Sequence, residues 1–155
     1  MGSQLIKGVK LMNSIHLICL GVLDLTASRK FYQALGFNEP ASEHADVIAF
    51  FNNFGTKLEL FPYEALLADI GLDAAENPMP TTFNGVTYAY NTKSVAEADR
   101  VFQRALANGA TLVKPLTWGD WGGYSGYFKE LNGYYWEVAY SKDWQFDAND
   151  MLIIQ

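Results

Sequence analysis

Two glutamates stand out in this 155-residue chain because each is centred in a short apolar strand. Glu59 lies in Leu-Glu-Leu and Glu137 in Trp-Glu-Val, and each follows the glycine of a predicted turn by four residues. A charged side chain in such a strand faces either solvent or a polar cavity. Both occupy equivalent points of an internal repeat, so we expect both to face a cavity. A carboxylate there can act as a general base.

The repeat is visible in the spacing of helix caps, turn glycines and glutamates. Asp24 and Ser94, the predicted N-caps of two helices, lie 70 residues apart. Gly55 and Gly133 lie 78 apart, as do Glu59 and Glu137, so the second unit is longer. A strand–helix–three-strand unit has an exposed apolar face that a second unit can cover. The sequence predicts an α+β fold, with two repeated βαβββ modules forming a curved mixed sheet around a cavity.

The predicted organisation has two modules, a connector and two flanking segments. Met12 can be read as a natural start, which makes residues 1–11 a cloning remnant. Prolines and acidic residues favour a loop in the later part of the connector. The predicted boundaries are residues 1–12 for an N-terminal extension, 13–62 for the first module, 63–83 for the connector, 84–141 for the second module and 142–155 for a C-terminal tail.

Hydrophobic periodicity places the elements within these boundaries. In the first module we expect strands at residues 15–22, 37–42, 47–51 and 57–61, and a helix from Asp24 to Gly36. The connector should hold a short helix at residues 64–70. In the second module we expect strands at residues 86–90, 111–114, 125–129 and 134–140, with a helix from Ser94 to Gly109.

Composition limits the classes of partner. The net charge of −6 argues against nucleic acid or an anionic membrane as the main partner. No apolar run is long enough to span a bilayer, and the N-terminus lacks the apolar stretch of a signal peptide. The single cysteine, Cys19, excludes an intrachain disulfide and reads as a small core residue. We expect a cytoplasmic domain.

Two stretches carry a resemblance to a known family. Residues 21–37 have an Asp-opened helix that contains Phe-Tyr and ends in Leu-Gly, and residues 121–138 run from Trp-Gly-Gly-Tyr to Trp-Glu-Val. Both are similar to the vicinal-oxygen-chelate superfamily, which includes glyoxalases, bleomycin-resistance proteins and extradiol dioxygenases. The resemblance covers about residues 13–141. One departure is Glu-Leu-Asn-Gly at residues 130–133 in place of Asp-Pro-Asp-Gly, where we expect Asn-Gly to supply the positive φ angles.

The resemblance implies a metal site that this chain matches only in part. Metal-dependent relatives place a ligand, usually His, on the first strand of each module and a Glu on the last. Glu59 and Glu137 match the Glu positions, but Leu17 and Thr87 stand at the first-strand positions. His16 is one residue away, which points its side chain to the other face unless a bulge near Gly21 restores it. We therefore favour no metal, with a divalent ion on His16, Glu59 and Glu137 as the alternative.

A glycine-rich aromatic stretch is the second candidate feature. Trp118, Trp121, Tyr124 and Tyr127 fall among glycines and suit a lid over an apolar ligand, with a packed loop end or a dimer contact as the alternative. Strand alternation adds Phe61, Tyr135, Thr87 and Asn91 to the faces of the two glutamates, although the two aromatic rings fit ordinary core packing equally well.

Two classes of function follow. The favoured hypothesis is a protein that binds a small organic molecule in an aromatic cavity, as a binding protein or as a metal-independent enzyme using Glu59 and Glu137. The alternative is a metal-dependent lyase or dioxygenase, in which a divalent ion bound by His16, Glu59 and Glu137 polarises substrate oxygens. The resemblance also implies a homodimer.

Overall fold

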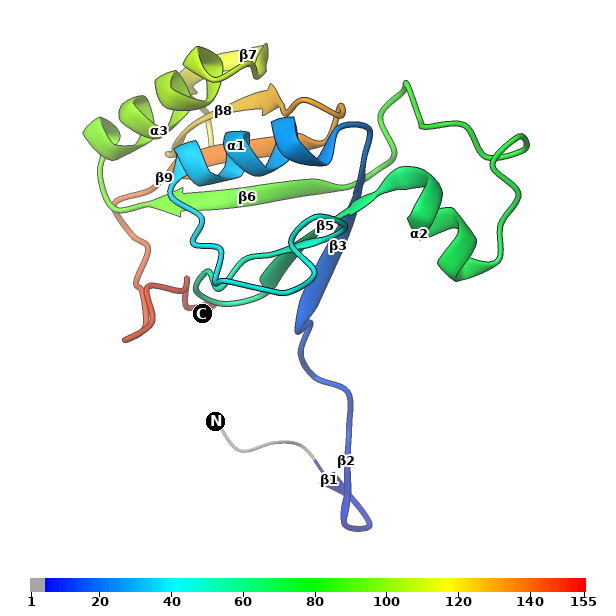
Figure 1. Ribbon diagram of the computed structural model, residues 1–155. Coiled ribbons are helices and arrows are strands. Elements are labelled where there is room, and N and C mark those ends of the chain that lie inside the picture. The colour runs from blue at the N-terminus through cyan, green and yellow to red at the C-terminus, as the bar shows by residue number, and fades with distance from the viewer. Residues whose placement is uncertain (1–4) are drawn as a thin grey trace.

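The computed structural model describes residues 5–155 and contains two separate mixed sheets with three helices. The first sheet has the strand order β3-β5-β4 and the second β6-β9-β8-β7; β1 and β2 form a small ribbon that extends away from the rest of the chain (Figure 1). The elements are β1 (Leu5–Ile6), β2 (Val9–Lys10), β3 (Leu17–Val22), α1 (Leu25–Leu35), β4 (Ala49–Phe50), β5 (Lys57–Pro62), α2 (Tyr63–Ile70), β6 (Thr87–Thr92), α3 (Val95–Ala107), β7 (Thr111–Trp118), β8 (Tyr124–Lys129) and β9 (Tyr135–Tyr140).

The predicted repeat is confirmed by strand pairing. In each module the first strand runs parallel to the last, β3 with β5 and β6 with β9. Cys19 pairs with Glu59 and Ala89 pairs with Glu137, so the two glutamates occupy the same register in their sheets. The α+β class with two repeated modules is therefore confirmed.

The first module has one strand fewer than expected. The predicted strand at residues 37–42 does not form, and the predicted strand at 47–51 is reduced to β4. Glu39 lies in the missing strand and instead forms a salt bridge with Arg29 of α1, with 2.9 Å between Nε and Oε2. This segment contains Pro40, which cannot donate to a strand ladder. The first sheet thus stops at β4.

The helix caps form as the sequence predicts. The Asp24 carboxylate accepts a hydrogen bond from the Ala27 amide, and the Ser94 hydroxyl accepts one from the Glu97 amide, each at 3.0 Å. Gly36 ends α1 with a φ of 110°, a left-handed conformation that favours glycine. Within residues 5–155, none of the helices is both long and apolar enough to cross a membrane.

The last hairpin departs from its predicted geometry. Gly133 has a φ of 88°, but Asn132 is not among the residues with positive φ, so the Asn-Gly pair supplies only one such angle. The Asn132 side chain instead links the modules, because it accepts from the Leu23 amide at 2.9 Å and donates to the Ser28 hydroxyl at 2.9 Å. Asn132 therefore does not adopt the predicted left-handed turn conformation, and its side chain forms a contact between the modules.

One core joins the modules, with α1 and α3 next to each other beside β6 (Figure 1). Phe31 of α1 and Phe102 of α3 both pack against Phe128 of β8, with ring centroids 6.4 and 6.0 Å apart. The Tyr134 hydroxyl donates to the Gly21 carbonyl at 2.7 Å across the same junction. α1 and α3 therefore cover one face of each sheet, and the glutamates lie on the opposite faces.

Candidate functional site

The face of the second sheet around Glu137 is polar and partly exposed. The Tyr127 hydroxyl donates to Glu137 Oε2 at 2.8 Å, and this hydrogen bond is the main reason that the pKa of Tyr127 is raised. Strand pairing continues the row to Lys114 on one side of Tyr127 and to Ala89 on the other side of Glu137. The row places an ammonium, a phenol and a carboxylate side by side on one sheet face.

The sequence-predicted neighbours of Glu137 lie where strand alternation puts them. Thr87 pairs with Tyr135 and Asn91 pairs with Ala139, one step before and one step after the Ala89–Glu137 pair on the same face. Thr87 and Ala89 are exposed, so this part of β6 has no cover from the described residues. The face is therefore open beside Thr87 and Ala89, whereas Ser125 and Ala139, further along the same face, are buried.

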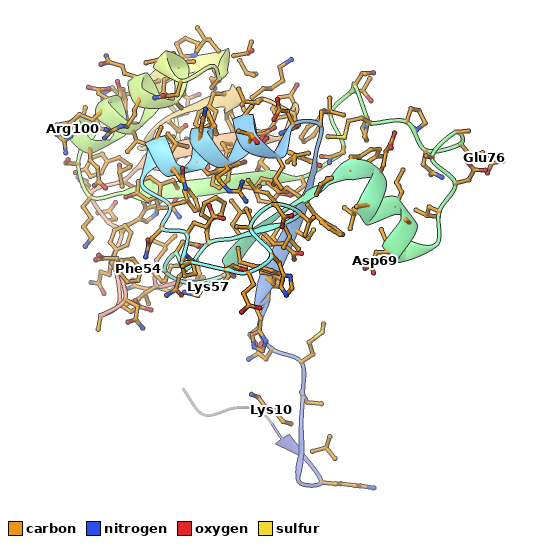
Figure 2. The ribbon with its side chains drawn as sticks, in the orientation of Figure 1. Lys10, Phe54, Lys57, Asp69, Glu76 and Arg100 are labelled. Atoms are coloured by element: carbon orange, nitrogen blue, oxygen red, sulfur yellow. The ribbon has the colours of Figure 1, made fainter. Side chains whose placement is uncertain are left out.

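The corresponding face of the first sheet has different surroundings. Burial raises the pKa of Glu59, Cys19 lowers it through a hydrogen bond, and Asp69 of α2 raises it through charge repulsion. The Lys57 ammonium bonds to the Asn53 carbonyl near the hairpin tip (Figure 2). Burial, followed by Glu59, raises the pKa of the Cys19 thiol to about 12, which keeps the sulfur protonated and weakly nucleophilic.

α2 covers part of this face. A β-carbon built on Gly21 of β3 would lie 2.7 Å from a ring atom of Tyr63 and 3.2 Å from a methyl of Leu66, both on α2. The glycine thus allows the helix to dock directly on the strand. Phe61, which pairs with Gly21, lies on the Glu59 face and is partly exposed, and its contact with a ligand stays a prediction.

The two carboxylates do not perturb each other as expected for residues in one cavity. The sequence predicts that two carboxylates facing one cavity repel each other and lose hydration, which raises the pKa of at least one of them unless Lys57 or another cation neutralises it. The pKa of Glu59 is raised, but the causes are burial and Asp69, and Glu137 is not among them. The raised pKa of Glu59 and the loss of hydration as its main cause agree with the expectation, whereas repulsion by Glu137 is not among the causes.

The aromatic stretch divides between the two faces of the second sheet. Trp118 pairs with Tyr124, whose hydroxyl bonds to Asp99 of α3 at 2.7 Å, so this pair lies toward the helix. The Trp121 ring stacks on Trp144 of the C-terminal tail at 6.0 Å. Only Tyr127 of the four aromatics contacts a candidate glutamate. Trp118 and Trp121 are nevertheless 58% and 55% exposed, so the lid, the dimer contact and the packed loop end all stay predictions.

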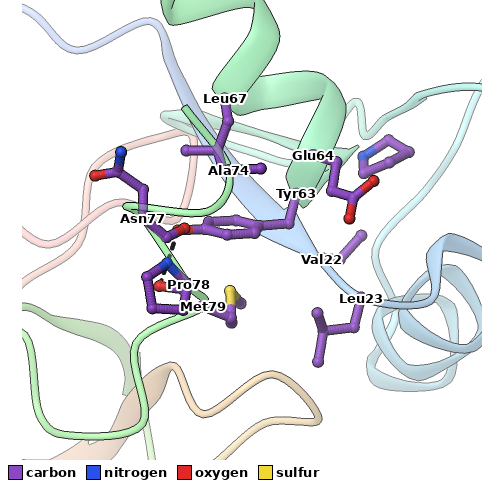
Figure 3. A pocket seen from close by; sticks show the side chains of 10 residues that line it. Val22, Leu23, Tyr63, Glu64, Leu67, Ala74, Asn77, Pro78 and Met79 are labelled. Carbon is purple, nitrogen blue, oxygen red and sulfur yellow. Dashed lines mark hydrogen bonds between the residues drawn. The ribbon is translucent and has the colours of Figure 1, made fainter. Parts of the chain in front are cut away.

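Two cavities lie at the ends of the sheets, beside the connector. One, of about 330 Å³, lies between α2 and the loop that follows α2 in the connector. Tyr63 crosses it and Glu64 borders it (Figure 3). The other, of about 300 Å³, lies between the connector and the last hairpin and includes Tyr135. Neither is lined by Glu59, Glu137 or the two tryptophans.

Sequence reasoning missed the connector as a source of cavity walls. Residues 77–79 line the first cavity and residues 79–82 the second, although the sequence marks this part of the connector only as a loop. In the structure the Tyr63 hydroxyl donates to the carbonyls of Asn77 and Pro78 at 2.9 and 3.2 Å and holds the loop against α2, a contact that no sequence pattern marks.

The residues around the glutamates do not fit a transition metal. His16 is exposed and its Nε2 lies 3.0 Å from the Ser14 hydroxyl. β3 pairs with β5 without a register shift, so no bulge near Gly21 turns His16 toward Glu59. In the part of the chain that the structure describes, no three His, Cys, Asp or Glu side chains form a group that could hold a metal. Carboxylates without imidazole or thiolate ligands make a weak site for zinc, nickel or iron.

Comparisons with known proteins agree with the fold. None of the curated proteins matches the chain. A glyoxalase-related enzyme from Fulvimarina pelagi is 25% identical with a TM-score of 0.79, covering 93% of this chain and 99% of that one. A glyoxalase/bleomycin resistance protein/dioxygenase from Nocardioides is 25% identical with a TM-score of 0.69, covering 87% of each chain. A lactoylglutathione lyase from Agrobacterium tumefaciens shares the fold at 24% identity and a TM-score of 0.60, covering 88% of this chain and 100% of that one.

The family assignment comes from the match to a family model. The model described as the Glyoxalase/Bleomycin resistance protein/Dioxygenase superfamily matches residues 14–138, which include both modules and both glutamates. This chain therefore belongs to the glyoxalase/bleomycin resistance protein/dioxygenase superfamily.

Proposed function

We propose that this protein binds a small organic molecule on the open face of the second sheet, with Glu137 and Tyr127 as the polar end of the site. The observation that carries the proposal is the 2.8 Å hydrogen bond between these side chains on a partly exposed face. Tyr127 fixes one carboxylate oxygen and leaves the other for a ligand. Tyr135, one pairing step away, offers an aromatic surface for the apolar part of the ligand.

The proposed chemistry needs no metal. The free oxygen of the Glu137 carboxylate can take a proton from a carbon acid, and the Tyr127 hydrogen bond holds the other oxygen and orients the group. Cys19 lies in the other module and carries a thiol with a pKa of about 12, so we assign it no nucleophilic role. Glu59 lies in the other module, on a face that α2 partly covers, and makes no contact with the ligand in this proposal.

A second copy of the chain is a further part of the proposal. β3 and β6 each form an open edge of their sheets, and exposed Leu17 and Tyr90 lie on these edges. Unpaired edges with apolar side chains favour strand pairing or coverage by another chain. A homodimer in the cytoplasm would protect both edges, and the molar mass in solution, measured by light scattering, tests it.

The binding proposal is tested by titrating a panel of small carbonyl compounds into the purified protein. Glu137→Gln should weaken binding of any hit by about 10-fold or more and should abolish any turnover, because it removes a charge that contacts the ligand. Glu59→Gln is the matched control from the other module and should have less than a 3-fold effect, a rough limit for a side chain without ligand contact.

Two outcomes oppose the proposal in different ways. Equal effects of the two substitutions would show that the Glu137 face is not the site. Near-unit occupancy of a transition metal in protein never exposed to chelator or nickel resin, lost on His16→Ala, would establish the metal-dependent alternative instead.

A further inference from the structure

The cavity beside the last hairpin contains one charged group. Its lining comes from the turn between β3 and α1, the connector and the last hairpin: Leu23, Met79, Pro80, Thr81, Thr82, Lys129, Leu131, Asn132, Gly133 and Tyr135. Lys129 is the only ionisable lysine, arginine, aspartate or glutamate in this set. Among residues 7–155, Lys129 makes no ion pair and its ammonium makes no hydrogen bond to a side chain or carbonyl. The cavity therefore offers an uncompensated positive charge.

The adjoining cavity has the opposite character. It shares Leu23 and Met79 with the first, but its only charged residue is Glu64, which lies near Val22 and Leu23 (Figure 3). A ligand anion is repelled there and attracted by Lys129. The chain has a net charge of −6, so the positive charge at the Lys129 cavity is opposite in sign to that of the protein as a whole.

The walls of the Lys129 cavity suit a small organic acid. The hydroxyls of Thr81 and Thr82 can donate to a carboxylate. Asn132 is already engaged by Leu23, Ser28 and Glu130, so it contributes shape and not a further donor. The volume of about 300 Å³ is at the lower end of the range for small-molecule sites.

Tyr135 connects this cavity to the Glu137 face. It lines the cavity, its ring packs edge-on against Phe83 at 5.0 Å, and it pairs with Lys129 across the sheet. Glu137 is two residues further along β9 on the same face, which corresponds to about 7 Å. An acid group at Lys129 would therefore leave the opposite end of a small ligand within reach of Glu137.

We propose that the cavity between the connector and the last hairpin binds the carboxylate of a small organic acid through Lys129, Thr81 and Thr82. The apolar body of the acid lies on Tyr135 and extends toward Glu137. This inference deepens the proposed function, since it names organic carboxylates as the ligand class of that face. The residues that line the cavity support it, and a binding experiment tests it without any enzyme assay.

The test compares three probes of similar shape and different charge, namely benzoate, benzamide and benzylammonium, titrated into the full chain and followed by amide chemical shifts. Benzoate should bind at least about 10-fold more tightly than benzamide, and benzylammonium should not shift the amides of Thr81, Thr82 or Gly133. Lys129→Met should remove the preference for benzoate, and Lys129→Arg should restore it. Lys142→Met, an exposed lysine outside the cavity, is the control and should leave it unchanged.

The outcomes separate this inference from the proposed function. If benzoate and benzamide bind equally, or if Lys129→Met leaves the preference intact, the carboxylate site is wrong even when Glu137→Gln still impairs binding of other ligands. If benzoate binding depends on Lys129 but no ligand responds to Glu137→Gln, the cavity is a carboxylate site and the proposal for the Glu137 face fails.

Discussion

The two modules place a glutamate at the same sheet position and surround it differently. Glu137 faces outward with Tyr127 as its hydrogen-bond partner, whereas Glu59 lies beside Cys19 and close to Asp69 of α2. The first sheet has three strands, and α2 is docked on its glutamate face. The second sheet has four strands, and no helix of the described residues is docked on its glutamate face. The repeat determines where each carboxylate lies, while the connector that follows β5 determines what it can contact. The second module therefore has the accessible carboxylate that we assign to ligand binding, whereas the carboxylate of the first module lies beside α2.

The largest expected difference is in thiol reactivity. With a pKa of about 12, Cys19 at pH 8 should react with iodoacetamide about 100-fold or more slowly than an unperturbed thiol, whose pKa is near 8.5. Glu59→Gln should accelerate the reaction, because it removes a negative charge that raises the pKa, while burial still slows it. Glu137→Gln should leave the rate unchanged. Mass spectrometry of the folded protein measures all three rates, and acceleration by Glu137→Gln would show that the two faces are coupled.

The second difference concerns the docking of α2. Gly21 and Asn91 occupy equivalent positions, opposite Phe61 and Ala139. Gly21→Ala should destabilise the protein by about 1–2 kcal/mol, because the new methyl meets a Tyr63 ring held in place by two carbonyls. Asn91→Ala should cost less than about 0.5 kcal/mol, because no helix covers it.

Denaturant unfolding of both variants measures this contrast. A stable Gly21→Ala protein would mean that α2 can move away from β3 at little cost. The first face would then be as open as the second, and the distinction between the modules would be lost.

Much of the frame, but little of the site, could be predicted from sequence. Asp24 and Ser94 identify the helix starts because capping is local, and the spacing of Glu59 and Glu137 gives their shared register. The missing strand at residues 37–42 could not be predicted, because a strand needs a partner and Glu39 pairs with Arg29 instead. The Lys129 cavity depends on how the connector folds back, and no local pattern encodes that contact.

A third contrast concerns pH and the two hairpins. In the second module the turn is held by Glu130, which is 3% exposed, accepts from the Tyr134 amide at 3.0 Å and has a pKa raised mainly by burial. In the first module the neutral Asn53 side chain accepts from the Leu58 amide at 3.0 Å. A carboxyl with a raised pKa in the folded state stabilises the fold at pH values below its unfolded pKa, and this contribution is lost as pH rises through the folded pKa.

The free energy of unfolding measured between pH 4 and 7 tests this contrast. Glu130→Gln should flatten the dependence on pH, because the amide does not ionise. Asn53→Ala should lower stability by an amount that does not change with pH. A wild-type stability that rises over this range, with the same slope in Glu130→Gln, would contradict the prediction.

The last contrast lies within the second module, and here the expected difference in stability between the two variants is the smallest. Tyr127 and Tyr124 each donate to a carboxylate, Glu137 at 2.8 Å and Asp99 at 2.7 Å, but they lie on opposite faces of β8. Each Tyr→Phe change removes one hydroxyl and should cost about 0.5–1.5 kcal/mol, so the two variants should have similar melting temperatures. Only Tyr127→Phe should also change ligand binding, because it frees the carboxylate that we assign to the site. Parallel thermal melts and ligand titrations provide the measurement. If both variants bind ligand like the wild type, the Glu137–Tyr127 bond only stabilises the sheet; if Tyr124→Phe weakens binding equally, the ligand lies toward α3.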